Sequence, residues 1–184
     1  SIVATGKNTT ILHCTQRTQQ LKTGDLIVVD IGAEYGQYAA DLTRTYPVGG
    51  QFSPRQREIY NLVLEAQAFI ESIAMPGMYL QNAQHPEKSL HHRAVRFFEE
   101  RGYGKYFCHR LGHYLGLDVH DVGSYAVPLE AGMMFTIEPG LYLAAENLGV
   151  RIEDDYIMAD DGAVCLSYDL PKEADAIEQM MRAE

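Results

Sequence analysis

The stretch from Leu26 to Thr43 constrains the fold more than any other part of the chain. Two apolar, strand-like runs flank a break at Tyr35-Gly36, and each run carries one aspartate at a position expected to be buried. If Tyr35-Gly36 is a two-residue hairpin turn, Asp30 lies directly opposite Asp41 on one face of the sheet, with Cβ atoms roughly 5 Å apart. Two buried carboxylates so close repel each other unless they are protonated, paired or bound to metal. Either the hairpin is wrong, or a cation lies between these aspartates.

Length and charge limit the classes of partner. At 184 residues the chain is long enough for a hydrophobic core, and we expect one domain over residues 1–184. The net charge of −10 argues against nucleic acid and against an anionic membrane surface as partners. No apolar run approaches the roughly 20 residues that span a bilayer. Three cysteines lack metal-finger spacing, which indicates reduced thiols and a cytoplasmic location.

The apolar pattern predicts an α+β fold with a largely antiparallel sheet, because helices and strands mix without a strict βαβ alternation. Ser53-Pro54-Arg55-Gln56 starts a helix with a capping box, and Met75-Pro76-Gly77 ends it. A last helix over 172–182 is expected to bury Ile177 and Met180-Met181. The other expected elements are two short strands within 1–14, a hairpin up to about Val48, a helix over 87–100, and strands over 133–138, 149–158 and 163–166.

Five acid or imidazole groups stand inside otherwise apolar, strand-like or loop-rich segments. They are Asp30, Asp41, His113, Glu138 and Glu153. Taken singly, a buried acid is more often paired with arginine or lysine than bound to metal. Five together are too many for the basic residues in comparable segments, of which Arg44 and Arg151 are the obvious ones. The set therefore favours a metal site.

The chemistry of this set indicates which metals it suits. Four carboxylates and one imidazole are hard, oxygen-rich ligands, which fit Mn²⁺, Co²⁺, Fe²⁺ or Zn²⁺ and argue against a thiolate zinc site. Four carboxylates are also more than one divalent ion needs. Two ions roughly 3.5–4 Å apart, bridged by carboxylates, would match the count and activate a water.

Histidines form a second cluster in the sequence. His109, His113 and His120 fall within twelve residues. One histidine alone would more often be structural, but three beside the proposed site suggest one ligand and two hydrogen-bond donors, which would stabilise the oxyanion of a tetrahedral intermediate. His13 is a weaker fourth candidate, for which a solvent-facing strand end is an equal alternative.

Five segments, in order along nearly the whole chain, together match one known pattern. They are Asn8 to His13, Asp30-Ile-Gly with Asp41-Leu-Thr-Arg-Thr, His109 to Asp121, Thr136-Ile-Glu138-Pro-Gly, and Val150-Arg-Ile-Glu153-Asp-Asp. The chain resembles the pita-bread metallopeptidases, which include Xaa-Pro aminopeptidase, prolidase and methionine aminopeptidase. In Asp41–Pro47 and Gly116–Gly123 it is most similar to Xaa-Pro aminopeptidase. The resemblance implies a pita-bread fold, in which helices flank a curved, mostly antiparallel sheet.

The resemblance implies a metal ligand at each of the five positions. Asp30 would chelate one ion, and Asp41 and Glu153 would bridge the pair. His113 and Glu138 would bind the other ion. Glu138 would also act as the general base toward the attacking water.

The resemblance also implies catalytic and substrate-binding residues around the metals. His109 and His120 would contact the scissile carbonyl and the developing oxyanion. His13 would help form the pocket on the proline side. Tyr142 and Arg151 would lie behind these groups and support substrate binding.

The implied activity is that of a dinuclear metal-dependent aminopeptidase, which hydrolyses the bond between an N-terminal residue and a following proline. It would use two divalent ions, Mn²⁺ in the first place, and its full-length form would be a homo-oligomer. Two alternatives stay open: a prolidase restricted to dipeptides, and a catalytically silent pita-bread domain that binds peptides. The family's catalytic domain begins with several helices before the strand that matches Ser1–Ala4, so we expect a domain incomplete at its N-terminus.

Overall fold

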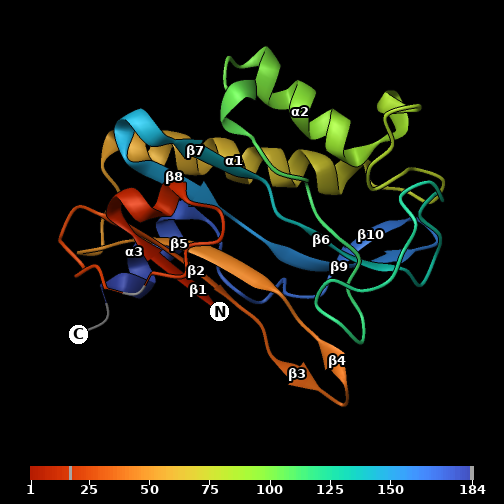
Figure 1. Cartoon of the computed structure of the whole chain (residues 1–184), viewed down its shortest axis with the longest axis horizontal. Helices are drawn as coiled ribbons and strands as arrows, with labels where there is room; N and C mark the ends of the chain where they lie inside the picture. The colour runs from red at the N-terminus through yellow and green to blue at the C-terminus, as the bar shows by residue number, and fades with distance from the viewer. Residues whose placement is uncertain (17, 183–184) are drawn as a thin grey trace.

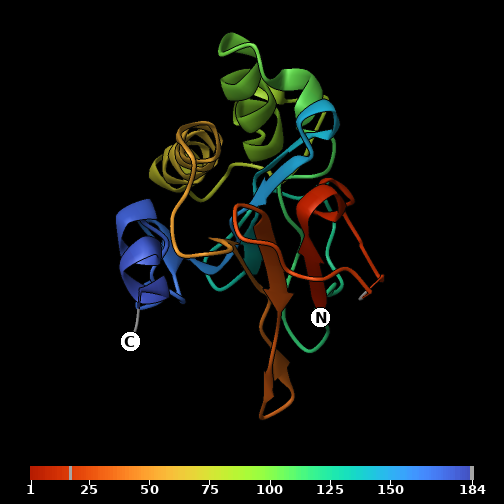
Figure 2. The ribbon, with the colours of Figure 1, turned by 90° about the vertical axis from the view of Figure 1, so that its left-hand side faces the viewer.

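The computed structural model describes residues 1–16 and 18–182 and confirms the α+β class. Helices α1 (Pro54–Ile73) and α2 (Leu90–Glu100) lie on the same side of the strands, as the two views show (Figures 1 and 2). The named strands pair antiparallel throughout. Within the described residues, no helix combines the length and apolar character needed to cross a membrane.

The first sheet has the order β1-β2-β5, formed by Ile2–Thr5, Leu26–Ile31 and Leu42–Pro47. The second strand predicted within residues 1–14 is wrong, because a 3₁₀ turn over Gly6–Thr10 follows β1. The hydroxyls of Thr9 and Thr10 donate to the carbonyls of Gly6 and Lys7, at 2.7 and 2.8 Å. Local side-chain hydrogen bonds of this kind compete with strand pairing.

The hairpin between β2 and β5 has a strand register that differs from the predicted one. Its tip is β3 (Glu34–Tyr35) and β4 (Tyr38–Ala39), and the turn is Gly36-Gln37 rather than Tyr35-Gly36. Both turn residues have positive φ, 56° and 73°, as a type I′ turn requires. Asp30 therefore pairs with Thr43, not with Asp41. A shift of two residues keeps Asp41 on the predicted face, because side chains alternate with period two.

The second half of the chain builds two further ladders. The order β6-β9-β10 comprises Met134–Ile137, Asp154–Ala159 and Gly162–Cys165, and β7 (Gly140–Leu143) pairs with β8 (Leu148–Arg151). The single strand predicted over 149–158 is wrong, since the chain breaks at Ile152-Glu153 between β8 and β9.

The break at Glu153 joins the two three-stranded sheets. The amide of Glu153 donates to the carbonyl of Thr43 at 3.0 Å, and the Thr43 amide donates back at 3.4 Å. Thr43 lies in β5 and Glu153 just before β9. Two segments 110 residues apart are thus fixed side by side in the middle of the molecule.

The helices close the core above the strands. The predicted capping box at the start of α1 is confirmed: Ser53 accepts from the Gln56 amide, and the Gln56 side chain accepts from the Ser53 amide. α1 contacts α2 and the strands β6, β7, β8 and β10, with Ile59, Val63 and Ile70 fully buried. α2 begins at Leu90 rather than residue 87, because Ser89 is its N-cap.

The last helix, α3 (Ala174–Met181), buries Ile177 as predicted. Met180 and Met181 were expected to face inward, and this is wrong, since they are 44% and 39% exposed. They fall in the final turn of the helix.

Candidate metal centre

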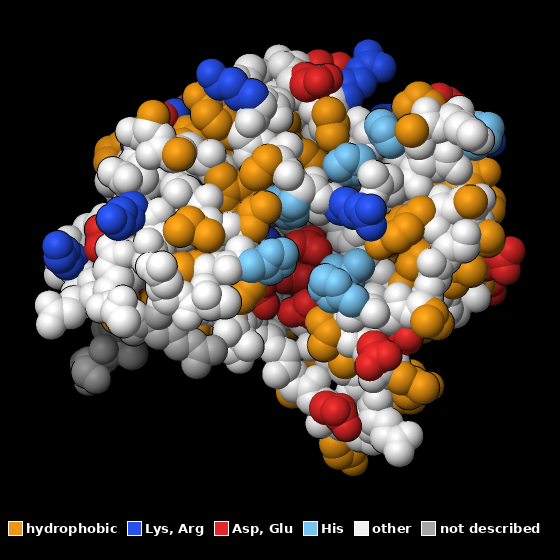
Figure 3. Space-filling model, in the orientation of Figure 1, with side chains coloured by type: hydrophobic (Ala, Val, Ile, Leu, Met, Phe, Trp, Pro, Cys, Tyr) orange, Lys and Arg blue, Asp and Glu red, His pale blue; other side chains and the backbone are white. Residues whose placement is uncertain are grey.

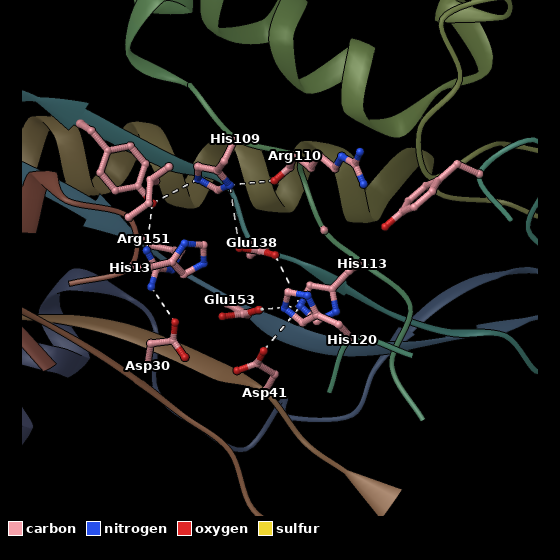
Figure 4. A pocket seen from close by; sticks show the side chains of 14 residues that line it. His13, Asp30, Asp41, His109, Arg110, His113, His120, Glu138, Arg151 and Glu153 are labelled. Atoms are coloured by element: carbon pink, nitrogen blue, oxygen red, sulfur yellow. Dashed lines mark hydrogen bonds and ion pairs between the residues drawn. The ribbon is translucent and has the colours of Figure 1, made fainter. Parts of the chain in front are cut away.

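The five side chains singled out in the sequence meet in one cavity of ≈ 240 Å³ (Figure 4). Asp30 comes from β2, and Asp41 directly precedes β5. Glu138 directly follows β6, and Glu153 lies in the break between β8 and β9. His113 comes from the irregular segment before β6. The cavity therefore lies at the joint of the two sheets, where carboxylates gather at the bottom of a hollow rimmed by histidines (Figure 3).

The ligand atoms in the cavity form three overlapping groups, within each of which all atoms lie within 4.8 Å of one another. The groups are Asp30 with Asp41 and Glu153; His113 with Glu138 and Glu153; and Asp41 with His113 and His120. Glu153, Asp41 and His113 each belong to two groups. The arrangement thus offers two adjacent cation positions that share ligands.

His113 is oriented as a metal-binding histidine would be. Its Nδ1 lies 3.0 Å from the carbonyl of Tyr114, which fixes Nδ1 as the donor and leaves Nε2 with a free lone pair. Nε2 lies 3.5 Å from Asp41, 3.6 Å from Glu138 and 3.9 Å from Glu153. Burial lowers the pKa of His113, but the Asp41 carboxylate and the Tyr114 carbonyl outweigh this and hold it above its ordinary value.

Three acids of the cavity are costly to ionise without a cation, namely Asp30, Glu138 and Glu153. Burial is the largest cause that raises the pKa of Glu138 well above its usual range, and the charge of Glu153 adds to it. Burial likewise raises the pKa of Glu153, with Asp41 the next cause. Burial also raises the pKa of Asp30, against the opposing effect of Arg151. Divalent ions among these oxygens would remove both the repulsion and the desolvation cost, so the residues present fit such a group.

The basic residues named from the sequence account for only part of this charge. Arg151 does pair with Asp30, at 2.6 Å, so the salt-bridge alternative holds for that acid. Arg44 instead pairs with Asp154 at 2.6 Å and donates to the main-chain carbonyl of Glu153 at 2.7 Å, so it neutralises none of the five side chains. The hydroxyl of Thr43 donates to Glu153 at 2.6 Å.

A chain of hydrogen bonds links Asp30 to His109. Arg151 donates from Nη2 to Asp30 and from Nη1 to the Tyr142 hydroxyl, at 2.6 and 3.0 Å. Tyr142 lies 3.1 Å from Nε2 of His109, whose Nδ1 lies 2.7 Å from the carbonyl of Arg110. Burial lowers the pKa of His109 to about 4, so the ring is neutral at pH 7, with Nδ1 as the donor. Both ring nitrogens of His109 therefore already have a hydrogen-bond partner.

The remaining predicted residues also line the cavity. His13 is exposed and lines the cavity wall, in a turn rather than a strand (Figure 4). The ring of His120 lies 4.1 Å from that of His113, centre to centre. Within the described chain the His120 ring makes no hydrogen bond, so it has an N–H to offer a bound molecule. Its nitrogen also lies in ligand range of Asp41 and His113, which makes it a candidate ligand as well.

The structure adds residues that sequence reasoning did not find. Both carboxylate oxygens of Asp155 accept from the Asp41 amide, at 3.2 and 3.3 Å, and burial raises the pKa of Asp155 to about 7. Its place after Glu153 was visible, but nothing in the sequence showed which amide it meets. His91, on α2, accepts from the Leu111 amide at 3.3 Å, and no signal in the sequence suggested this role.

Comparisons with known proteins agree with this geometry. Residues 1–160 match the model of metallopeptidase family M24. The chain is 40% identical to the Xaa-Pro aminopeptidase of Haemophilus influenzae, over 98% of this chain and 47% of that protein. It is also 40% identical to the Xaa-Pro dipeptidase of Pyrococcus furiosus, over 89% of this chain and 45% of that one.

Solved structures show the same fold. Proline aminopeptidase P II from Yersinia pestis has a TM-score of 0.88 and 36% identity, and covers 98% of this chain and 47% of its own. A variant of Escherichia coli aminopeptidase P in complex with substrate has a TM-score of 0.86 and 35% identity, over 98% and 46%. The chain thus has the pita-bread fold of these catalytic domains and spans about half the length of the relatives it matches. With most of its length matched in sequence, the chain belongs to metallopeptidase family M24.

Proposed function

We propose that this chain carries the catalytic centre of a dinuclear metal-dependent aminopeptidase, which releases an N-terminal residue that precedes proline. The observation that carries the proposal is the pair of ligand groups that share Glu153, with the free Nε2 of His113 aimed into one of them. The relatives named Xaa-Pro aminopeptidase support the substrate class.

The metal ligands would be Asp30, Asp41, His113, Glu138 and Glu153. When bound, two divalent ions supply Lewis acidity and lower the pKa of water toward neutrality. Glu138 is suited to hold the proton taken from the attacking water, because burial raises its pKa.

The histidines would divide the remaining tasks. His120 has a ring nitrogen free to donate to a developing oxyanion, whereas both nitrogens of His109 are already bonded. His109 would therefore shape the wall and keep Tyr142 and Arg151 in place. His13 would contact the proline side. Mn²⁺ as the cellular metal, a cytoplasmic location and homo-oligomeric assembly stay predictions.

The test combines metal content with hydrolysis by the complete protein. We expect two ions per chain by elemental analysis, and release of glycine from Gly-Pro-Leu but not from Gly-Ala-Leu. Asp41→Ala should abolish both metal binding and hydrolysis. Hydrolysis at the normal rate by this variant would overturn the proposal, and metal binding without hydrolysis would favour a silent peptide-binding domain.

A second candidate is an Xaa-Pro dipeptidase, which the identity to the Pyrococcus furiosus enzyme favours. The two activities differ in the length of peptide accepted. Cleavage of Gly-Pro with no cleavage of Gly-Pro-Leu would assign the dipeptidase.

A further inference from the structure

Arg110 brings a guanidinium group to the wall of the cavity (Figure 4). Within the described part of the chain, this guanidinium makes no hydrogen bond and no ion pair. It lies instead over the ring of Tyr125, with 5.1 Å between its central carbon and the ring centre. A cation that lines a cleft without an anionic partner is available to a ligand.

The position of Arg110 is fixed from two sides. Its carbonyl oxygen accepts from His109 at 2.7 Å, which holds the backbone. The Tyr125 ring beneath the guanidinium packs on the ring of Tyr114 at 5.5 Å, and the Tyr114 hydroxyl donates to the carbonyl of Ser124 at 3.2 Å. Stacking on an aromatic face leaves the N–H edges of a guanidinium free to donate.

The other arginine of the cavity cannot take this role. Arg151 is buried and donates to Asp30, Tyr142 and Thr43. Among the described residues that line the cavity, Arg110 is therefore the cation left for an anion. The chain has a net charge of −10 and four acids at the cavity floor. An anionic group is therefore repelled by the floor of the cavity and attracted by Arg110 at its wall.

We propose that Arg110 binds the C-terminal carboxylate of short peptide substrates. The inference rests on the proposed function, and it adds a preference for substrate length. A peptide has an ammonium group at one end and a carboxylate at the other. With its N-terminus toward the acidic floor, it presents the carboxylate to the opposite wall, where the guanidinium can bind both oxygens. Each further residue moves the carboxylate by about 3.3–3.6 Å, so only certain lengths reach Arg110.

The experiment compares free acids with amides in the complete, metal-loaded protein. The peptides are Gly-Pro, Gly-Pro-Leu and Gly-Pro-Leu-Leu, each with a free or an amidated C-terminus. At one length or more, we expect the KM of the free acid to be lower than that of the amide on the order of tenfold, as a charge-assisted bidentate contact would give. Arg110→Gln should remove this ratio, and Arg110→Lys should restore it in part.

Arg101→Gln is the matched control, since Arg101 also lies over an aromatic ring, that of Phe97, but outside the cavity. This variant should keep the ratio of the unmodified protein. Equal KM values for acid and amide at all three lengths would overturn the proposal. A preference for Gly-Pro-Glu-amide over Gly-Pro-Leu-amide, without one for free acids, would assign a side-chain carboxylate and overturn the terminal assignment.

Binding of a product-like peptide separates this proposal from the proposed function. Calorimetry with Pro, Pro-Leu and Pro-Leu-Leu, each as free acid and amide, needs no turnover. At one length or more, the free acid should bind more tightly than the amide to the unmodified protein but not to Arg110→Gln. If no peptide is hydrolysed but this difference is found, the function fails and the carboxylate site stands. If hydrolysis occurs and the difference is absent, the carboxylate site fails alone.

Discussion

Glu153 is the residue on which the two cation positions depend most. It is 2% exposed, belongs to two of the three ligand groups, and its main chain ties the two sheets together. Of the two groups that contain Glu153, Asp30 belongs only to one and His113 only to the other. Loss of the Glu153 charge should therefore affect both positions at once.

We predict that Glu153→Gln holds fewer than one ion per chain under conditions in which the unmodified protein holds two. The amide keeps the size of the side chain and an acceptor for Thr43, so folding should survive, but it is a much weaker metal ligand than a carboxylate. Elemental analysis after dialysis measures the content. Glu178→Gln removes another buried carboxylate, which pairs with Arg57 away from the cavity, and should leave the content unchanged. Two ions per chain in Glu153→Gln would contradict the shared-ligand arrangement.

At the scale of single residues, the sequence predicted which side chains meet but not how they are supported. An ionisable side chain inside an apolar run is a strong sequence signal. The five candidates that were identified by this signal all lie in one cavity. The contact of Asp155 with the Asp41 amide depends on the exact register of distant strands. Sequence reasoning could not show that Arg44 forms its ion pair with Asp154 rather than with one of the five side chains, because such pairs are set by tertiary packing.

At the scale of elements, period-two alternation protected the prediction from an error of register. The turn was placed one residue too early, yet Asp30 and Asp41 still share a face, because the pairing shifted by two residues. The irregular segment around His109 and His113 shows the opposite case. It has no periodicity, and its shape is set by contacts with β6, such as the donation from the Thr136 amide to the His113 carbonyl at 2.9 Å.

Gly32 sets the distance between the two sides of the hairpin beside the candidate metal ligands. A Cβ added there would lie 1.9 Å from the carbonyl oxygen of Ala40, which directly precedes Asp41. We predict that Gly32→Ala displaces Asp41 and weakens metal binding on the order of 10–100-fold, as loss of a ligand's support commonly does. Metal titration measures this.

Gly36→Ala serves as the control for Gly32→Ala. A Cβ at Gly36 meets nothing within 4 Å, although its φ of +56° strains the turn. This variant should bind metal normally, since the turn is at the far end of the hairpin. Unchanged affinity in Gly32→Ala would show that Asp41 does not depend on the close approach.

His91 connects α2 to the segment that carries the site histidines. Its Nδ1 accepts from the Leu111 amide at 3.3 Å, and the Leu111 carbonyl accepts from the Glu138 amide at 2.8 Å. Burial lowers the pKa of His91 to about 4, with His92 and Arg110 as further causes. Because the folded pKa lies below that of the unfolded chain, the unfolded state takes up the proton first, and stability is lost as pH falls from about 6.5 toward 4.

We predict that His91→Asn reduces the loss of stability between pH 7.5 and pH 5. Asparagine keeps an acceptor close to the position of Nδ1 but does not titrate. Urea unfolding at both pH values gives the difference in free energy of unfolding. His85→Asn, before α2, should keep the pH dependence of the unmodified protein. An identical dependence in His91→Asn and the unmodified protein would show that His91 does not carry this effect.

At the scale of the whole molecule, the candidate metal centre coincides with the seam between the two halves of the fold. The first sheet supplies Asp30 and Asp41, and the second half supplies His113, Glu138 and Glu153. Fold class and antiparallel pairing followed from the order of helices and strands. The break of the predicted strand 149–158 did not, because the residues on both sides of it are buried without interruption and only the tertiary pairing of Glu153 with Thr43 divides them.

Removal of metal should therefore loosen the joint between the halves. A ligand present at 100 times its Kd stabilises the folded state by about 2.7 kcal/mol per site. For a domain of this size each kcal/mol changes Tm by about 2–4 °C, so we expect a chelator to lower Tm by roughly 5–10 °C per site lost. Differential scanning calorimetry of the metal-loaded and chelated protein measures this, and added Mn²⁺ should restore the higher Tm. Asp41→Ala supplies the control, because its Tm should not respond to chelator or to Mn²⁺. Equal Tm values for the loaded and chelated forms of the unmodified protein would mean that the acids at the seam need no cation, and that protons and Arg151 are enough to hold the two halves together.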